Sequence, residues 1–157
     1  MVRTFMIAAA SAVALMLSAP VFAQQGGTAQ EARAMLDKAV AAVRADKAKA
    51  IDMFNKGEGG FLDRDLYVFC GNVTDAKLVA NGNPNAKQLL GTDARNLKDS
   101  NGKAYGQEIF EMGQKPEGQV TEVTGYLFPT PRDPKPVAKN SFVTKVGDIY
   151  CGVGYYK

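Results

Sequence analysis

Histidine is absent from the chain, and this absence restricts the chemistry that the protein can perform. The 157 residues also include only two cysteines and no tryptophan. Without imidazole there is no Ser-His-Asp or Cys-His nucleophile, no histidine-based zinc site and no C-x-x-C-H haem attachment. Two thiolates alone cannot complete a tetrahedral metal site. We therefore expect a protein that is not an enzyme and that holds no cofactor and no metal.

Two acidic motifs are the remaining candidates for catalysis or metal binding. Asp63-Arg64-Asp65 brings two carboxylates together, but the arginine between them favours a structural ion pair. Asp99-Ser100-Asn101-Gly102 has the beginning of a calcium loop without its later ligands, so a turn is the simpler explanation. Neither motif changes the expectation of a non-catalytic protein.

Cys70 and Cys151 are the two cysteines, and both lie in segments with the composition of strands. In an oxidising compartment an even number of cysteines favours a disulfide. The bridge would close a loop of about 80 residues and would stabilise the fold by roughly 4–5 kcal/mol in the chain-entropy treatment. The alternative is a pair of buried free thiols that pack as small apolar side chains.

A long helix is the first element expected to position these residues. Thr28-Ala29-Gln30-Glu31 has the capping-box pattern, and apolar residues then recur at helical spacing as far as Phe54. The pattern predicts a helix over 29–56, about 40 Å long at 1.5 Å per residue. A helix of this length must lie across a whole sheet or pair with a second copy. A homodimer through this helix is therefore one expectation.

The rest of the chain combines strand patterns with a helical insertion. A short helix at 85–90, and an amphipathic helix after the turn at 99–102, form this insertion. A proline-rich loop is expected at 129–136. Five segments rich in aromatic and β-branched residues predict strands: 65–70, 76–80, 120–128, 139–146 and 149–156. This order predicts an α+β domain in which the long helix packs on one antiparallel sheet of about five strands.

The two faces of the predicted sheet differ in chemistry. Because side chains alternate along a strand, Leu66 and Val68 share one face with Cys70. Tyr67 and Phe69 then lie on the other face. A disulfide would place both cysteines on the aliphatic face, which suits the long helix. The opposite face is aromatic.

The aromatic face is the predicted ligand-binding site. Gly152 lies on this face in the last strand, and a glycine within a strand often marks the close approach of a ligand. Lys139 and Arg132 offer a cation for a carboxylate, and Tyr126 offers a hydrogen bond. The candidate ligand-binding residues are therefore Tyr67, Phe69, Tyr126, Arg132, Lys139 and Gly152.

Each of these residues also has a purely structural explanation. The helical insertion would pack on the aromatic face in either case and would then fill the space, with Tyr67 and Tyr126 as core aromatics whose hydroxyls are satisfied. Arg132 lies in the proline-rich loop, where a solvated side chain is the simpler expectation. Lys139, at a strand edge, is equally consistent with either role.

Four segments, in this order, resemble single Cache domains. They are DRDLYVF at 63–69, GTDARNLKDSNG at 91–102, YLFP at 126–129 and the closing CGVGYY at 151–156. The resemblance covers about residues 30–157. It implies an extracytoplasmic relative of the PAS fold, with a long N-terminal helix on an antiparallel sheet and a pocket on the opposite face.

The resemblance also implies a function. Cache domains bind small metabolites, often short carboxylates or amines, and usually belong to chemoreceptors or sensor kinases. Because no signalling module follows Lys157, we expect a solo form that relays binding to a separate membrane partner. Gly118-Gln119-Val120 stands where the family often has tryptophan, so ligand preference does not transfer. The alternative is a protein-interaction or structural module without a small ligand.

Charge argues against nucleic acid as a partner. The formal net charge is only +3, and basic residues do not cluster with interleaved aromatics.

The first 23 residues have the pattern of a secretory signal peptide. Arg3 supplies a positive start, an apolar run without charge extends from Phe5 to Leu17, and Val21-Phe22-Ala23 provides a cleavage site. The run is too short for a stable membrane span, although an uncleaved anchor is the alternative. We expect a signal peptide at 1–23 and a single Cache-like domain at 24–157, located in the periplasm or secreted.

This pattern predicts cleavage after Ala23. The intact mass of the exported protein should correspond to a chain that begins at Gln24. A mass that still includes residues 1–23 would contradict the prediction and favour the uncleaved anchor.

Overall fold

The structure is a computed structural model that describes residues 26–157, so the predicted cleavage site lies outside the described residues. Six antiparallel strands form one sheet, in the order β1-β2-β6-β5-β4, with β3 also paired to β2. The strands are β1 (Leu62–Asp63), β2 (Leu66–Asn72), β3 (Leu78–Asn81), β4 (Thr121–Pro129), β5 (Pro136–Val146) and β6 (Ile149–Tyr156). The predicted α+β class is confirmed, with β1 as a sixth strand that the sequence did not indicate.

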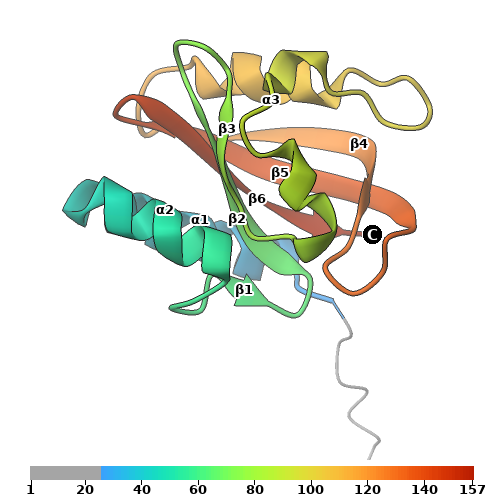
Figure 1. The fold of residues 1–157 in the computed structure, drawn as a ribbon, viewed down its shortest axis with the longest axis horizontal. Coiled ribbons are helices and arrows are strands. Elements are labelled where there is room, and N and C mark those ends of the chain that lie inside the picture. The colour runs from blue at the N-terminus through green and yellow to red at the C-terminus, as the bar shows by residue number, and fades with distance from the viewer. Residues whose placement is uncertain (1–25) are drawn as a thin grey trace, which may run out of the picture.

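Helices cover both faces of the sheet. α1 (Ala29–Ala45) and α2 (Lys47–Lys56) lie against one face, and α3 (Tyr105–Gly113) lies on the opposite side (Figure 1). Two 3₁₀ helices, η1 (Pro84–Leu89) and η2 (Ala94–Asn96), complete the insertion between β3 and β4. Between residues 26 and 157, none of the helices combines the length and the apolar character needed to cross a membrane.

The predicted helix over 29–56 is interrupted at Asp46. Asp46 has an extended backbone (φ −159°, ψ 100°), and its carboxylate accepts a hydrogen bond from the Lys49 amide. Aspartate favours this N-cap conformation because its short side chain competes with the backbone for hydrogen bonds. One residue therefore ends α1 and begins α2, which corrects the prediction of one continuous helix. The predicted capping box of Thr28 and Glu31 is confirmed.

Two apolar clusters lie on the two sides of the sheet, as the alternation of side chains predicts. Leu66, Val68 and Cys70 belong to the cluster under α1 and α2, together with Cys151 of β6. Tyr67 and Phe69 of β2 belong to the second cluster, which also contains Tyr105 and Ile109 of α3. The sheet thus separates an aliphatic layer from an aromatic layer.

The disulfide joins two central strands. Cys70 and Cys151 lie directly opposite each other in the β2–β6 register, and their sulfurs are bonded across a sequence separation of 81. Both residues are fully buried. The bridge therefore ties β2, which carries Tyr67, to the C-terminal strand from the aliphatic side of the sheet.

Replacing both cysteines by alanine should lower the free energy of unfolding by about 4–5 kcal/mol without loss of the fold. The physical reason is the loop entropy returned to the unfolded chain, because alanine keeps the site apolar. Urea unfolding of the double variant, compared with the oxidised and reduced wild type, measures the difference. Equal stability of oxidised and reduced wild type would contradict the prediction.

Candidate functional site

A small cavity lies between the aromatic face of the sheet and the helical insertion. Its volume is about 30 Å³, enough for roughly two water molecules. The sheet supplies one wall through β2, β3, β4 and β5, and η1, η2 and α3 supply the other. The lining residues are Tyr67, Phe69, Leu78, Asn81, Leu89, Ala94, Leu97, Tyr105, Gly106, Ile109, Tyr126, Phe128 and Lys139.

Lys139 of β5 is the one lining side chain that can carry a positive charge, among the residues that the structure describes. It is 1 % exposed, and its Nζ donates a hydrogen bond to the Tyr67 hydroxyl at 2.6 Å. Within residues 26–157 no carboxylate forms an ion pair with it. A buried ammonium without an opposite charge is costly, so this arrangement is unusual for a lysine.

Aromatic rings surround the Lys139 ammonium in place of a counter-ion. Nζ lies 4.2 Å from the centroid of the Tyr67 ring and 4.9 Å from that of Phe128. The rings of Phe69, Tyr126 and Tyr156 follow at 5.6, 6.0 and 5.2 Å. The negative faces of such rings attract a cation and recover part of the lost solvation. We call these five rings with Lys139 the lysine cage.

Burial changes the protonation of the lysine cage. Desolvation lowers the pKa of Lys139 to about 7, and the attraction of Asp65 only partly opposes this shift. Desolvation also raises the pKa of Tyr67 to about 12, and the pKa values of Tyr126 and Tyr156 well above their usual range. The tyrosines therefore stay neutral near pH 7, whereas Lys139 is held close to its point of half-protonation.

Hydrogen bonds fix the hydroxyl that faces Lys139. The Tyr67 hydroxyl accepts from Asn83 Nδ2 at 3.4 Å and lies 3.5 Å from the Tyr156 hydroxyl. Both Asn83 and Tyr156 also donate to the Pro129 carbonyl, at 2.8 and 2.6 Å. The Tyr126 hydroxyl is paired with Ser141 at 2.6 Å. The Tyr67 and Tyr126 hydroxyls are thus held in place by side chains from β5, β6 and the N-cap of η1.

The structure brings four of the six predicted ligand-binding residues together. Tyr67, Phe69, Tyr126 and Lys139 all line the cavity. Arg132 is exposed in the loop between β4 and β5 and is not among the lining residues. The simpler expectation for Arg132, a side chain on the surface, is the one that the structure supports.

Gly152 does not leave room for a ligand. A Cβ atom built there would lie 2.3 Å from the Phe69 ring, so this ring already occupies the space. Gly154 has the same role for the aliphatic part of Lys139, whose Cε would lie 2.1 Å from a Cβ at that position. The glycines of β6 accommodate the cage's own side chains, which corrects the idea of an open gap above Gly152.

Several residues of the site were not predicted. Phe128 and Tyr156 follow Tyr126 and Gly152 at even spacing along their strands, so alternation alone would have placed them on the aromatic face. Tyr105 of α3 stacks on Tyr126 with ring centroids 4.8 Å apart. Asn83, which lies in a turn, gave no pattern that would have identified it.

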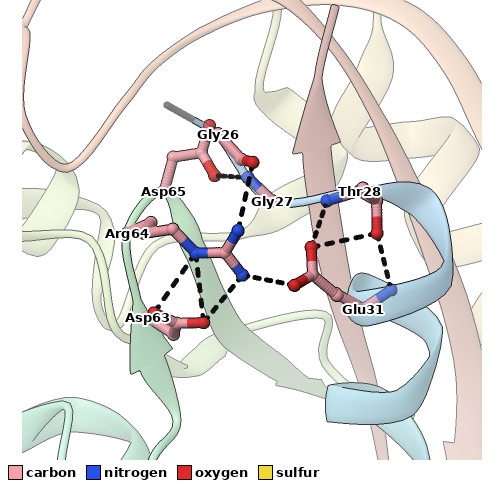
Figure 2. A network of polar contacts seen from close by, with 7 residues as sticks. All are labelled: Gly26, Gly27, Thr28, Glu31, Asp63, Arg64 and Asp65. Atoms are coloured by element: carbon pink, nitrogen blue, oxygen red, sulfur yellow. Dashed lines mark hydrogen bonds and ion pairs between the residues drawn. The ribbon is translucent and has the colours of Figure 1, made fainter. Parts of the chain in front are cut away.

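The two acidic motifs are structural. Arg64 bonds to Asp63 and Glu31 at 2.9 and 2.7 Å, and it also donates to the Gly26 carbonyl (Figure 2). Asp65 accepts a hydrogen bond from the Gly27 amide at 2.6 Å, so this network attaches the segment before α1 to the β1–β2 turn. Arg64 keeps a positive φ of 56° within this network.

The second motif forms a turn. Asp99 accepts hydrogen bonds from the amides of Asn101, Lys103 and Leu127. These bonds use the carboxylate to hold the segment before α3 against β4. In the part of the chain from 26 to 157, acidic and cysteine side chains do not gather in a group that would hold a metal ion.

Several solved structures share this fold. The periplasmic sensor domain of a chemotaxis protein is 23% identical, with a TM-score of 0.59 over 81% of this chain and 88% of the other. A methyl-accepting chemotaxis protein from Vibrio parahaemolyticus RIMD 2210633 is 20% identical, with a TM-score of 0.63 over 81% and 86%. A structure described as the basis for carboxylic acid recognition by a Cache chemosensory domain is 20% identical, with a TM-score of 0.58 over 81% and 86%.

Sequence comparison identifies the family. No curated protein sequence matches the chain. The family model "Single Cache domain 2" matches residues 12–156, which is nearly the whole sequence. This match agrees with the fold that the chain shares with a Cache chemosensory domain. The chain belongs to the single Cache domain 2 family, a class of sensory domains.

Proposed function

We propose that this domain binds a small carboxylate in the cavity at Lys139 and acts as a sensor outside the cytoplasm. One observation carries the proposal: the Lys139 ammonium is buried at the cavity wall without an acidic partner among the described residues. A ligand carboxylate would supply the missing charge and accept a charge-assisted hydrogen bond. The Tyr67 hydroxyl, 2.6 Å from Nζ, lies beside the same position.

The lysine cage favours an anion over an amine. An aromatic cage is the usual environment for a cationic ligand, but here the protein's own ammonium occupies it, 4.2 Å from the Tyr67 centroid. A ligand amine would meet a like charge. Because Lys139 is the single cation in the described lining, a second carboxylate would be buried unpaired. The site therefore suits one carboxylate with a small apolar remainder, and carboxylic acid recognition by a structurally similar Cache domain supports this choice.

Size limits the ligand. A cavity of about 30 Å³ holds a group of only a few atoms unless the walls move. The wall most able to move is the insertion, because η1, η2 and α3 are joined to the sheet by loops, whereas the opposite wall is continuous sheet. Movement of α3 over the sheet is a natural way for binding to change the surface of the domain.

The proposal includes the location of the domain, its membrane partner and its oligomeric state. The mature domain comprises residues 24–157, is exported to the periplasm, and passes the binding signal to a membrane partner. A homodimer through the exposed side of α1 would present two such domains together.

A module without a ligand is the second candidate, and the packing of the cavity favours it. Tyr105 stacks almost parallel on Tyr126, and Phe128 packs edge-on against Tyr105 at 5.8 Å. These side chains fill most of the space between α3 and the sheet. In that case the lysine cage would have only a structural role.

Titration calorimetry with acetate and propionate at pH 6 distinguishes the two candidates. We expect binding to the wild type, and Lys139→Met should weaken it about ten- to a hundredfold, which corresponds to a hydrogen bond with a charged group. Lys98→Met removes an exposed lysine and should leave the affinity unchanged. Methylamine and ethylamine, cations of similar size, should not bind.

Two results would contradict the proposal. If neither acetate nor propionate binds to or thermally stabilises the wild type, the module without a ligand is favoured. If Lys139→Met and Lys98→Met bind the carboxylates as tightly as the wild type, binding takes place elsewhere on the molecule.

A further inference from the structure

We infer that a carboxylate enters the Lys139 site together with a proton, so that the species captured is equivalent to the neutral acid. The inference rests on the proposed function and concerns how the same site is regulated. Its basis is geometric: the Lys139 amine is buried, and within residues 26–157 its hydrogen-bond partner is a neutral hydroxyl, that of Tyr67.

The hydrogen bond between Lys139 and Tyr67 can form with the uncharged amine as well as with the ammonium. An ammonium donates to the Tyr67 hydroxyl, whereas a neutral amine can donate to it or accept from it across the same 2.6 Å. Without a ligand, the five rings are the principal compensation for a charge, and desolvation lowers the pKa of Lys139 to about 7. The free site therefore exchanges its proton near neutral pH.

The charged and titratable groups around Lys139 do not fix its protonation state in the absence of a ligand. Tyr67, Tyr126, Tyr156 and Tyr105 face it from β2, β4, β6 and α3, and burial keeps all four phenols neutral because it raises their pKa values. Asp65 of the β1–β2 turn attracts the ammonium, but its carboxylate is held by the Gly27 amide. The described lining from β3, η1 and η2 is uncharged: Leu78, Asn81, Leu89, Ala94 and Leu97.

A bound carboxylate shifts the balance toward the ammonium. Its negative charge beside Nζ favours the protonated form and raises the pKa of Lys139 in the complex. The reaction is a neutral amine plus a carboxylate anion plus one proton from solvent, which gives an ammonium–carboxylate pair with no net charge. Proton uptake should be absent well below the pKa of the free amine and should approach one per ligand above it.

Affinity should therefore fall as the pH rises above neutrality. With a free-site pKa of about 7, the binding-competent ammonium form falls about tenfold per pH unit above this value. The dissociation constant of propionate should increase about 50- to 100-fold between pH 6 and pH 9. A site with a permanently charged lysine would keep the same affinity over this range.

Calorimetric titration of the mature wild-type protein with propionate tests the inference. At pH 8, the heat measured in HEPES and in Tris, two buffers of different ionisation enthalpy, should reveal uptake of about one proton per ligand. At pH 6, MES and Bis-Tris, which buffer there and differ in ionisation enthalpy, should give nearly the same heat. Lys139→Arg keeps a permanent charge and should bind without this pH dependence. Lys98→Met should behave as the wild type.

The outcomes separate this inference from the proposed function. Binding with an unchanged dissociation constant from pH 6 to pH 9 and without buffer-dependent heat would overturn the inference and leave carboxylate binding intact. The same pH dependence in Lys139→Arg would also overturn it, because the proton would then come from another group. No binding of propionate at any pH would overturn both. If Lys139→Arg does not fold, the wild-type titrations decide.

Discussion

The buried ammonium of Lys139 is the constraint on which the rest of the site depends. Removing a charged amine from water is costly, and within the described chain no carboxylate pairs with it. The protein compensates with ring faces and with one hydroxyl, that of Tyr67. Such compensation is partial, and incompletely balanced buried charges are concentrated at functional sites. The cavity beside Lys139 is where a ligand would complete it.

The layered fold makes this arrangement possible. The aliphatic face of the sheet packs on α1 and α2 and contains the Cys70–Cys151 bridge, on the side away from the cavity (Figure 1). β2 and β6, which the bridge joins, present Tyr67 and Tyr156 to the other side. The sheet therefore positions the residues of the lysine cage, and α3 packs over them from the other side.

Alternation along strands predicted much of this structure, because a half-buried sheet imposes a period of two on its sequence. It identified the faces of Tyr67 and Phe69 and the common face of the two cysteines. Simple alternation does not hold where a strand contains a bulge. Gly125, at a φ of 68°, lies in a bulge of β4, and this bulge puts Val123 and Tyr126 on the same side of the sheet. The sequence also did not predict how side chains would fill the space on the aromatic face. Nothing in the residue order says that the Phe69 ring fills the space over Gly152.

The most direct test of the account is the pH dependence of stability, compared between the wild type and Lys139→Met. A lysine whose folded-state pKa is lowered to about 7 binds fewer protons when folded than when unfolded at higher pH, so stability must rise with pH above 7. Urea unfolding should show a gain of about 2 kcal/mol between pH 7 and pH 9 in the wild type relative to the variant. Identical pH profiles for the two proteins would mean that Lys139 keeps an ordinary pKa in the folded state, and would contradict the account.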